Sequence, residues 1–267
     1  MDAVDRIATE LRRLQARARI GSATAGLQRY YRVTADTPPV IDAVLLSDAR
    51  IAAVPVRDCA EPLIDLRESA FEVDQRQADA EGHWALLREG AAHRLEQAQR
   101  ALPAGYRLVV VEGYRPVELQ RRYFAEHMTF LRERNPEWDG NQVRRAASAY
   151  ISPPEVAPHP TGGAVDLTLR GPDGRLCWMG TEVNDTPEES DGACYTNAAN
   201  ICAESRANRA LLHAAMSAAG FVNYPTEWWH WSIGERYWAF VTGTELARYG
   251  AVSQTRGPYG VSPSRRA

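Results

Sequence analysis

Four residues suited to metal binding and acid–base chemistry fall in two short segments of this chain. His159 and Asp166 lie in PHPTGGAVDLTL, and Glu227 and His230 lie in PTEWWHW. Two imidazoles and one carboxylate suit a catalytic zinc ion, which takes three protein ligands and leaves a fourth position for water. A nearby carboxylate can take the proton of that water. We therefore predict a hydrolytic metal site with His159, Asp166 and His230 as ligands and Glu227 as general base.

The spacing within each segment places conditions on the backbone. Gly162 and Gly163 allow the chain to fold back between His159 and Asp166, because glycine tolerates positive φ. Residues three apart in a regular strand point to opposite faces. Glu227 must therefore lie at the bent entry to a strand or across a bulge. Any one of these residues alone is more often a surface residue, so the specific signal is the two segments together.

Two buried strands are expected to position this chemistry. The β-branched run at 107–112 predicts one strand, and the next, at 164–169, places Asp166 opposite its apolar neighbours. Helical periodicity or turn residues mark most other segments. We predict helices over 3–18, 83–102, 116–134, 142–150 and 204–219, further strands at 221–224 and 228–233, short extended pieces within 40–58 and at 64–67, and loops over 152–163 and 184–200.

This mixture predicts an α+β fold, because helices and strands alternate without strict βαβ order. We expect a helical N-terminal extension over 1–40, a catalytic domain over 41–250 and a flexible tail over 251–267. The tail is rich in Ser, Gly, Pro and Arg, a composition typical of loosely held termini.

Composition narrows the function classes. The 267 residues are 45% hydrophobic and 24% charged, with a formal net charge of −3, which is ordinary for a globular protein and untypical of one that binds nucleic acid. The sequence has no apolar run of the ~18 residues that a membrane span requires. The N-terminus lacks an apolar signal region, so we expect a cytoplasmic protein with neither nucleic-acid nor membrane partners. A cytosolic chain would keep its cysteines reduced. None of the four forms a CxxC pair: Cys59, Cys177, Cys194 and Cys202.

Three blocks together resemble the D-Ala-D-Ala dipeptidases of the VanX type: EGYRP, PHPTGGAVDLTL and GFVNYPTEWWHW. The resemblance extends over about residues 60–240 and includes IDLR and WMGT. That family is related to D-Ala-D-Ala carboxypeptidases and hedgehog-type zinc domains, which implies a small antiparallel central sheet flanked by helices. It also implies a Zn²⁺ cofactor, the ligands and base named above, and a role for Arg115 in polarising the scissile carbonyl. Spacing alone would favour a surface arginine at the start of a helix.

Two positions depart from the family pattern on the substrate side. Ala157 stands where these dipeptidases carry a serine, two residues before the first zinc histidine. Asn184 stands where the block MGTxFD carries the aspartate that pairs with the free amine of the dipeptide, since this chain reads MGTEVND. Loss of a charged partner for a buried ammonium costs about 3–5 kcal/mol. Asp185, Glu182 or Asp191 could supply the charge, or the substrate could lack a free amine.

Three functions follow from these observations. The first is a zinc dipeptidase that hydrolyses D-Ala-D-Ala or a similar small dipeptide. The second is a related zinc amidase or carboxypeptidase that acts on a peptidoglycan fragment or another amide. The third is a non-catalytic zinc-binding domain, which Glu227 and Arg115 disfavour because a structural site needs neither an open position nor a base. Trp228, Trp229 and Trp231 should pack behind the ligands, and we expect Trp229 also to contact the substrate. Surface or packing roles are expected for His83, His93, His127 and His213.

Overall fold

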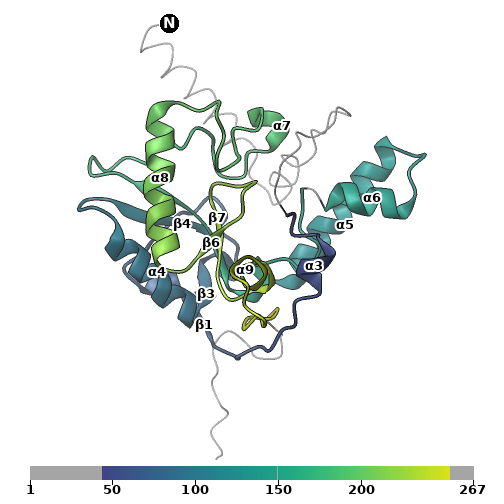
Figure 1. Ribbon diagram of the computed structural model, residues 1–267, viewed down its shortest axis with the longest axis horizontal. Helices are drawn as coiled ribbons and strands as arrows, with labels where there is room; N and C mark the ends of the chain where they lie inside the picture. Colours follow the sequence, from purple (N-terminus) through teal and green to yellow (C-terminus); the bar gives the residue numbers. More distant parts are fainter. Residues whose placement is uncertain (1–43, 149, 253–267) are drawn as a thin grey trace, which may run out of the picture.

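The computed structural model describes residues 44–148 and 150–252. The helix predicted at 3–18, the extension over 1–40 and the tail from 253 lie outside these residues. Within them, helices surround a five-stranded sheet, which confirms the α+β class (Figure 1). The helices are α3 (Ala49–Ala52), α4 (Glu89–Ala101), α5 (Val117–Arg134), α6 (Gly140–Ala147), α7 (Pro187–Ser190), α8 (Ala203–Ala218) and α9 (Arg236–Thr242), with 3₁₀ turns η2 (Leu66–Glu68), η3 (His83–Ala85) and η4 (His159–Thr161).

The central sheet has the strand order β2-β4-β5-β7-β6. Its strands pair antiparallel except at one edge, where β2 runs parallel to β4. A separate two-stranded antiparallel sheet joins β1 and β3. The strands are β1 (Leu63–Asp65), β2 (Glu72–Val73), β3 (Leu86–Arg88), β4 (Arg107–Glu112), β5 (Ala164–Arg170), β6 (Val222–Asn223) and β7 (His230–Ser232).

The main hydrophobic core lies between one face of this sheet and the helices α4 and α8, which run side by side (Figure 1). Leu167 and Leu169 of β5 pack there with Leu95 of α4 and Leu212 of α8. Because side chains alternate along a strand, Asp166 of β5 points to the opposite face. The strand predictions at 107–112 and 164–169 are confirmed, and they separate a core face from a site face.

The helices α5 and α6 form a second packing unit, which projects from the rest of the molecule in Figure 1. Pro116 precedes the first turn of α5, and Asp139 caps α6 with a reciprocal capping box to Gln142. The predicted helices at 116–134 and 142–150 are confirmed, the second ending earlier. The buried side chains of this unit are Phe124, Leu131, Val143, Ala147 and Ile151.

Two predictions for the N-terminal half of the described chain are wrong. In place of strands, residues 44–58 contain α3 and an isolated bridge from Val56 to Ala247. Asp48 caps α3, and Ile51 packs into a small core with Tyr224. The helix predicted from residue 83 begins only at residue 89, because residues 86–88 pair with β1 as a strand. Non-local pairing overrides the helical periodicity there.

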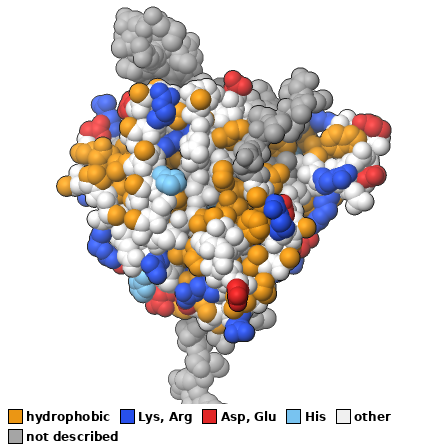
Figure 2. All heavy atoms as spheres, in the orientation of Figure 1, with side chains coloured by type: hydrophobic (Ala, Val, Ile, Leu, Met, Phe, Trp, Pro, Cys, Tyr) orange, Lys and Arg blue, Asp and Glu red, His pale blue; other side chains and the backbone are white. Residues whose placement is uncertain are grey.

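The surface mixes side chains of both charges. On the face in Figure 2, basic and acidic groups are interspersed among apolar ones. Among the described residues, no helix combines the length and hydrophobicity required to cross a bilayer.

Candidate metal centre

The site is organised by a row of residues across three strands of the central sheet. Asp166 on β5 stands directly opposite His230 on β7, and on its other side it stands opposite Glu112 on β4. Cross-strand partners point to the same face of a sheet and lie close together. The register therefore brings one predicted metal ligand against another, although they are far apart in the sequence.

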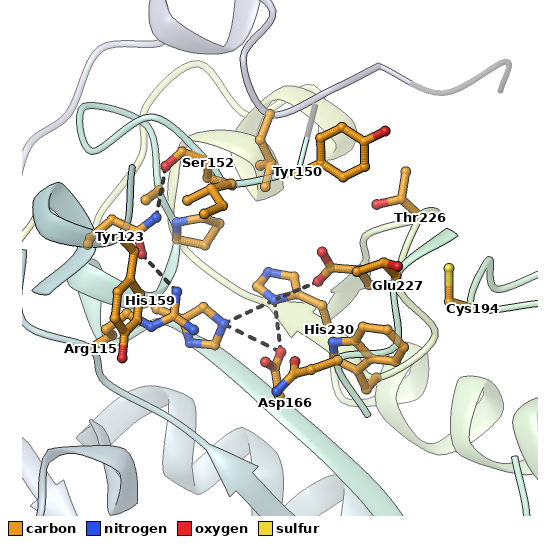
Figure 3. Close-up of a pocket in the computed structure, with 18 of the residues that line it drawn as sticks. Arg115, Tyr123, Tyr150, Ser152, His159, Asp166, Cys194, Thr226, Glu227 and His230 are labelled. Carbon is orange, nitrogen blue, oxygen red and sulfur yellow. Dashed lines mark hydrogen bonds and ion pairs between the residues drawn. The ribbon is translucent and has the colours of Figure 1, made fainter. Parts of the chain in front are cut away.

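His159 from η4 completes a compact triad with these two residues (Figure 3). His230 Nδ1 lies 2.9 Å from Asp166 Oδ1, and His159 Nε2 lies 3.2 Å from His230 Nδ1 and 3.4 Å from Asp166 Oδ1. All three side chains are buried. Ligand atoms about 2.0–2.2 Å from a tetrahedral zinc ion are separated from one another by roughly 3.3–3.6 Å. The donor set of the triad fits such an ion, and its separations of 2.9–3.4 Å are the same as or slightly shorter than this spacing.

The backbone around His159 fixes which ring nitrogen faces the triad. His159 Nδ1–H donates to the carbonyl oxygen of Gly113 at 2.6 Å, which leaves the lone pair of Nε2 directed at the other ligands. Gly162 ends η4 with φ of +69°, so the predicted fold-back at the glycine pair is present. A Cβ on Gly163 would lie 2.5 Å from the carbonyl oxygen of Ile233. Glycine is therefore required there by close backbone contact as well.

Electrostatic interactions within the triad shift the pKa values of Asp166 and His230. Burial by itself would raise the pKa of Asp166, but the imidazoles of His159 and His230 hold it below its usual range. Burial by itself would lower the pKa of His230, and the adjacent Asp166 raises it instead. The Asp166 carboxylate and the His230 imidazole thus stabilise one another's charged forms.

Glu227 lies in the turn that leads into β7. Its backbone N–H donates to Tyr224 O at 2.9 Å, and the N–H of His230 donates to Glu227 O at 3.2 Å. The predicted bent entry to the strand is confirmed, but Trp228 and Trp229 form turn rather than strand. Glu227 Oε2 lies 3.9 Å from His230 Nδ1, and burial raises the pKa of this carboxylate against the attraction of His230.

Arg115 enters the same site from the segment between β4 and α5 (Figure 3). Its Nε and Nη2 donate to the two carboxylate oxygens of Glu112 at 2.7 and 2.6 Å, and its Nη1 donates to Gln120 Oε1 at 2.8 Å. The backbone N–H of Arg115 also donates to His159 O at 3.4 Å. The arginine is therefore tied to the segment that carries the first candidate metal ligand, His159.

One pocket is lined by the triad, Glu227 and Arg115. It is also lined by the four residues predicted on the substrate side: Ala157, Asn184, Asp185 and Trp229. Asn184 has φ of +69°, a conformation that asparagine tolerates better than most residues. Glu182 and Asp191 are not among the described residues that line the pocket. Glu182 instead pairs with Arg76, with 3.3 Å between Glu182 Oε2 and Arg76 Nη1.

Sequence reasoning missed several residues of this pocket. Glu112, which does not line the pocket but binds Arg115, could have been found, since it directly precedes GYRP and ends a buried strand. No sequence pattern around Cys194 indicated a place in the pocket, because the long loop that carries it reaches the site only in the folded chain. The missed lining residues include Gln120, Tyr123, Tyr150, Ser152, Thr186, Cys194 and Thr226.

The tryptophans next to His230 form part of the main core. Trp228, Trp229 and Trp231 are buried, and the indole N–H of Trp228 donates to Thr181 Oγ1 at 2.8 Å. Trp231 stands opposite Val165 in the sheet register, on the face away from the ligands. Trp231 therefore packs behind the candidate ligands as predicted, whereas Trp229 also lines the pocket.

Comparison with known proteins identifies the family. Residues 69–242 match the family described as D-ala-D-ala dipeptidase. The chain belongs to this family. It is 28% identical over 219 residues to the D-alanyl-D-alanine dipeptidase of Synechocystis sp., covering 70% of this chain and 88% of that protein. It is 29% identical over 149 residues to that of Enterococcus faecium, covering 54% and 71% respectively.

Membership of the D-Ala-D-Ala dipeptidase family makes this chain a metallopeptidase, as predicted. Among solved structures, that of the LdcB LD-carboxypeptidase is similar with 18% identity and a TM-score of 0.40, over 70% of this chain and 76% of that one.

Proposed function

We propose that this chain is a zinc-dependent dipeptidase that hydrolyses D-Ala-D-Ala or a similar small dipeptide. The observation that carries the proposal is the convergence in one pocket of the triad, the Glu227 carboxylate and the Arg115 guanidinium. The relatives named D-alanyl-D-alanine dipeptidase support the choice of substrate.

His159, Asp166 and His230 would hold the metal. Two imidazoles and one carboxylate are a ligand set that zinc takes in hydrolytic enzymes, where one coordination position stays open. The chemistry that zinc supplies when bound is Lewis acidity, which allows water to lose a proton near neutral pH.

Glu227 and Arg115 have complementary tasks in this proposal. The Glu227 side chain is 34% exposed, so solvent reaches it while its backbone stays fixed in the turn. It takes the proton of the attacking water and passes it to the departing amine. Arg115 donates to the carbonyl oxygen of the scissile bond as negative charge grows there.

Asp185 is the residue that we assign to the amino group of the substrate. Three carboxylates are present among the described residues that line the pocket, and two of them, Asp166 and Glu227, belong to the metal and proton chemistry. Asp185 Oδ2 accepts the backbone N–H of Glu182 at 2.9 Å, which fixes its carboxylate in the loop. The neutral amide of Asn184 beside it favours a second candidate function, a zinc amidase whose substrate carries no charged amine.

A substrate profile of the zinc-loaded protein separates these functions. We expect turnover of D-Ala-D-Ala and weaker turnover of L,D- and L,L-dipeptides, with N-acetylated dipeptides poor substrates. Preference for N-acetylated substrates would support the amidase instead. Glu227→Gln should retain zinc and lose about 10²–10⁴-fold in kcat, the contribution typical of a general base. Normal turnover by this variant would refute the mechanism.

A further inference from the structure

We propose that Glu112 is a positioning residue that holds Arg115 in its catalytic orientation. The inference rests on the proposed function, in which Arg115 donates to the carbonyl oxygen of the substrate. Glu112 is buried, lies outside the triad of candidate ligands and has no other role in the chemistry described above.

A β-bulge places Glu112 on the site face of the sheet. Val110 pairs with Leu167, so a regular antiparallel ladder would set residue 112 against residue 165, which faces the core. The register instead shifts between Val110 and Glu112, and Glu112 stands opposite Asp166. A bulge adds one residue to one strand and turns the side chains that follow it. The irregularity at the end of β4 therefore brings a carboxylate into the site.

The contacts of Arg115 define the plane of its guanidinium group. Glu112 accepts two hydrogen bonds from it, 2.7 and 2.6 Å long, in the bidentate geometry that orients an arginine most strongly. Gln120 accepts a third bond and donates its own amide N–H to Ser152 O at 2.8 Å. The guanidinium carbon lies 5.6 Å from the centre of the Tyr123 ring. Glu112 thus restrains one edge of the Arg115 guanidinium group, Gln120 restrains another edge, and the Tyr123 ring covers one face.

Orientation matters here because a donor to a developing oxyanion must be in place before the charge forms. An unrestrained arginine has many rotamers, and a misplacement of about 1 Å can reduce catalysis roughly 10²-fold. Glu112 acts on the reaction only through Arg115. Its loss should therefore lower kcat, leave KM and the metal almost unchanged, and have no effect once Arg115 is gone.

The test is Glu112→Gln, which keeps the size of the side chain and removes its charge and bidentate acceptor geometry. A matched control is Glu72→Gln, since Glu72 accepts a two-point contact from Arg170 on the same sheet, away from the pocket. We expect Glu112→Gln to lower kcat for D-Ala-D-Ala by about 10- to 100-fold. KM should stay within about threefold and zinc content should be unchanged. The control should remain within about twofold of wild type.

A double-mutant cycle distinguishes positioning from a general structural role. In the Arg115→Ala background, Glu112→Gln should change kcat by less than about twofold, because the residue that it positions is absent. An equal loss in both backgrounds would overturn the proposal. So would Glu112→Gln activity equal to that of the Glu72→Gln control.

A readout independent of activity separates this proposal from the proposed function. Hydrogen exchange of the Arg115 Nε–H, followed by NMR, should be about tenfold faster or more in Glu112→Gln, since that N–H bonds to Glu112. Unchanged exchange would overturn the positioning role. If the wild type hydrolyses no dipeptide, the proposed function fails, while the exchange experiment still decides whether Glu112 restrains Arg115.

Discussion

The two walls of the pocket are built in different ways (Figure 3). We call the lining residues that lie between 115 and 157 in the sequence, before His159, the arginine wall; they include Arg115, Gln120, Tyr123, Ser152 and Ala157. We call the lining residues of the loops at 184–194 and 226 the loop wall; they include Asn184, Asp185, Thr186, Cys194 and Thr226.

The arginine wall is tied to the central sheet. Arg115 bonds to Glu112 at the end of β4, and its backbone bonds to His159. The loop wall is held instead by local turns and by helix α8. Asn184 adopts positive φ, and Thr186 forms a capping box with Glu189 on the short helix α7. Arg209 of α8 donates to the carbonyl oxygens of Ala193 and Tyr195. Chemistry common to many substrates requires fixed geometry, whereas loops can vary without disturbing a core. We infer that the arginine wall supports catalysis and the loop wall sets specificity.

The largest effect is expected at the triad between the two walls. Asp166→Ala removes the only carboxylate ligand, so we expect loss of bound zinc and a decrease in kcat/KM of about 10³-fold or more. Metal analysis and kinetics of the same preparation check both outcomes. The matched control is Asp185→Ala in the loop wall, which should keep its zinc. Equal zinc loss in both variants would contradict the assignment of ligands.

Gly113→Ala tests the rigidity of the arginine wall. A Cβ at this position would lie 2.3 Å from the carbonyl oxygen of Leu86, and Gly113 O accepts the hydrogen bond of His159. We expect about 1–3 kcal/mol of destabilisation together with weaker zinc binding. Urea unfolding of Gly113→Ala beside Gly140→Ala measures the difference, because a Cβ on Gly140 meets nothing within 4 Å. Equal free energies of unfolding for the two variants would show that the backbone at Gly113 can shift to accommodate a Cβ.

Asp185→Asn tests the specificity assigned to the loop wall. Loss of the charge should raise KM for dipeptides with a free amine by about 10- to 100-fold, the range for a hydrogen bond to a charged group. Turnover of N-acetylated dipeptides should hardly change. Asn184→Asp, which adds a carboxylate beside it, should lower KM for the free amine. If Asp185→Asn raises KM equally for free and N-acetylated dipeptides, Asp185 does not bind the amino group of the substrate.

The smallest effect is expected from the backbone of the loop wall. Asn184→Val places a β-branched residue at φ of +69° and should cost about 1–2 kcal/mol of unfolding free energy. Asn184→Gly should stay within about 0.5 kcal/mol of wild type, since glycine accepts this conformation. Thermal unfolding of both variants provides the measurement. If the valine variant is as stable as wild type, the loop backbone adjusts to the new residue. The loop wall would then be less rigid, relative to the arginine wall, than its hydrogen bonds indicate.

Much of the site could be predicted because its signals are local. The residue types and spacings in PHPTGGAVDLTL and PTEWWHW pointed to three candidate ligands and a candidate base, which the structure brings together. The alternation along residues 164–169 gave the correct face for Asp166. Gly162 has the positive φ that the fold-back requires. Arg115 was different, since only the family resemblance distinguished it from a surface arginine.

The sequence by itself determined the inventory of chemical groups and the local segments that carry them, because composition, periodicity and turn preferences act over a few residues. The tertiary structure decided which groups meet. The bulge that sets Glu112 against Asp166, the strand at residues 86–88 and the approach of Cys194 all depend on pairing between distant segments. Such pairing is settled by burial and register over the whole core, which no short stretch of sequence contains.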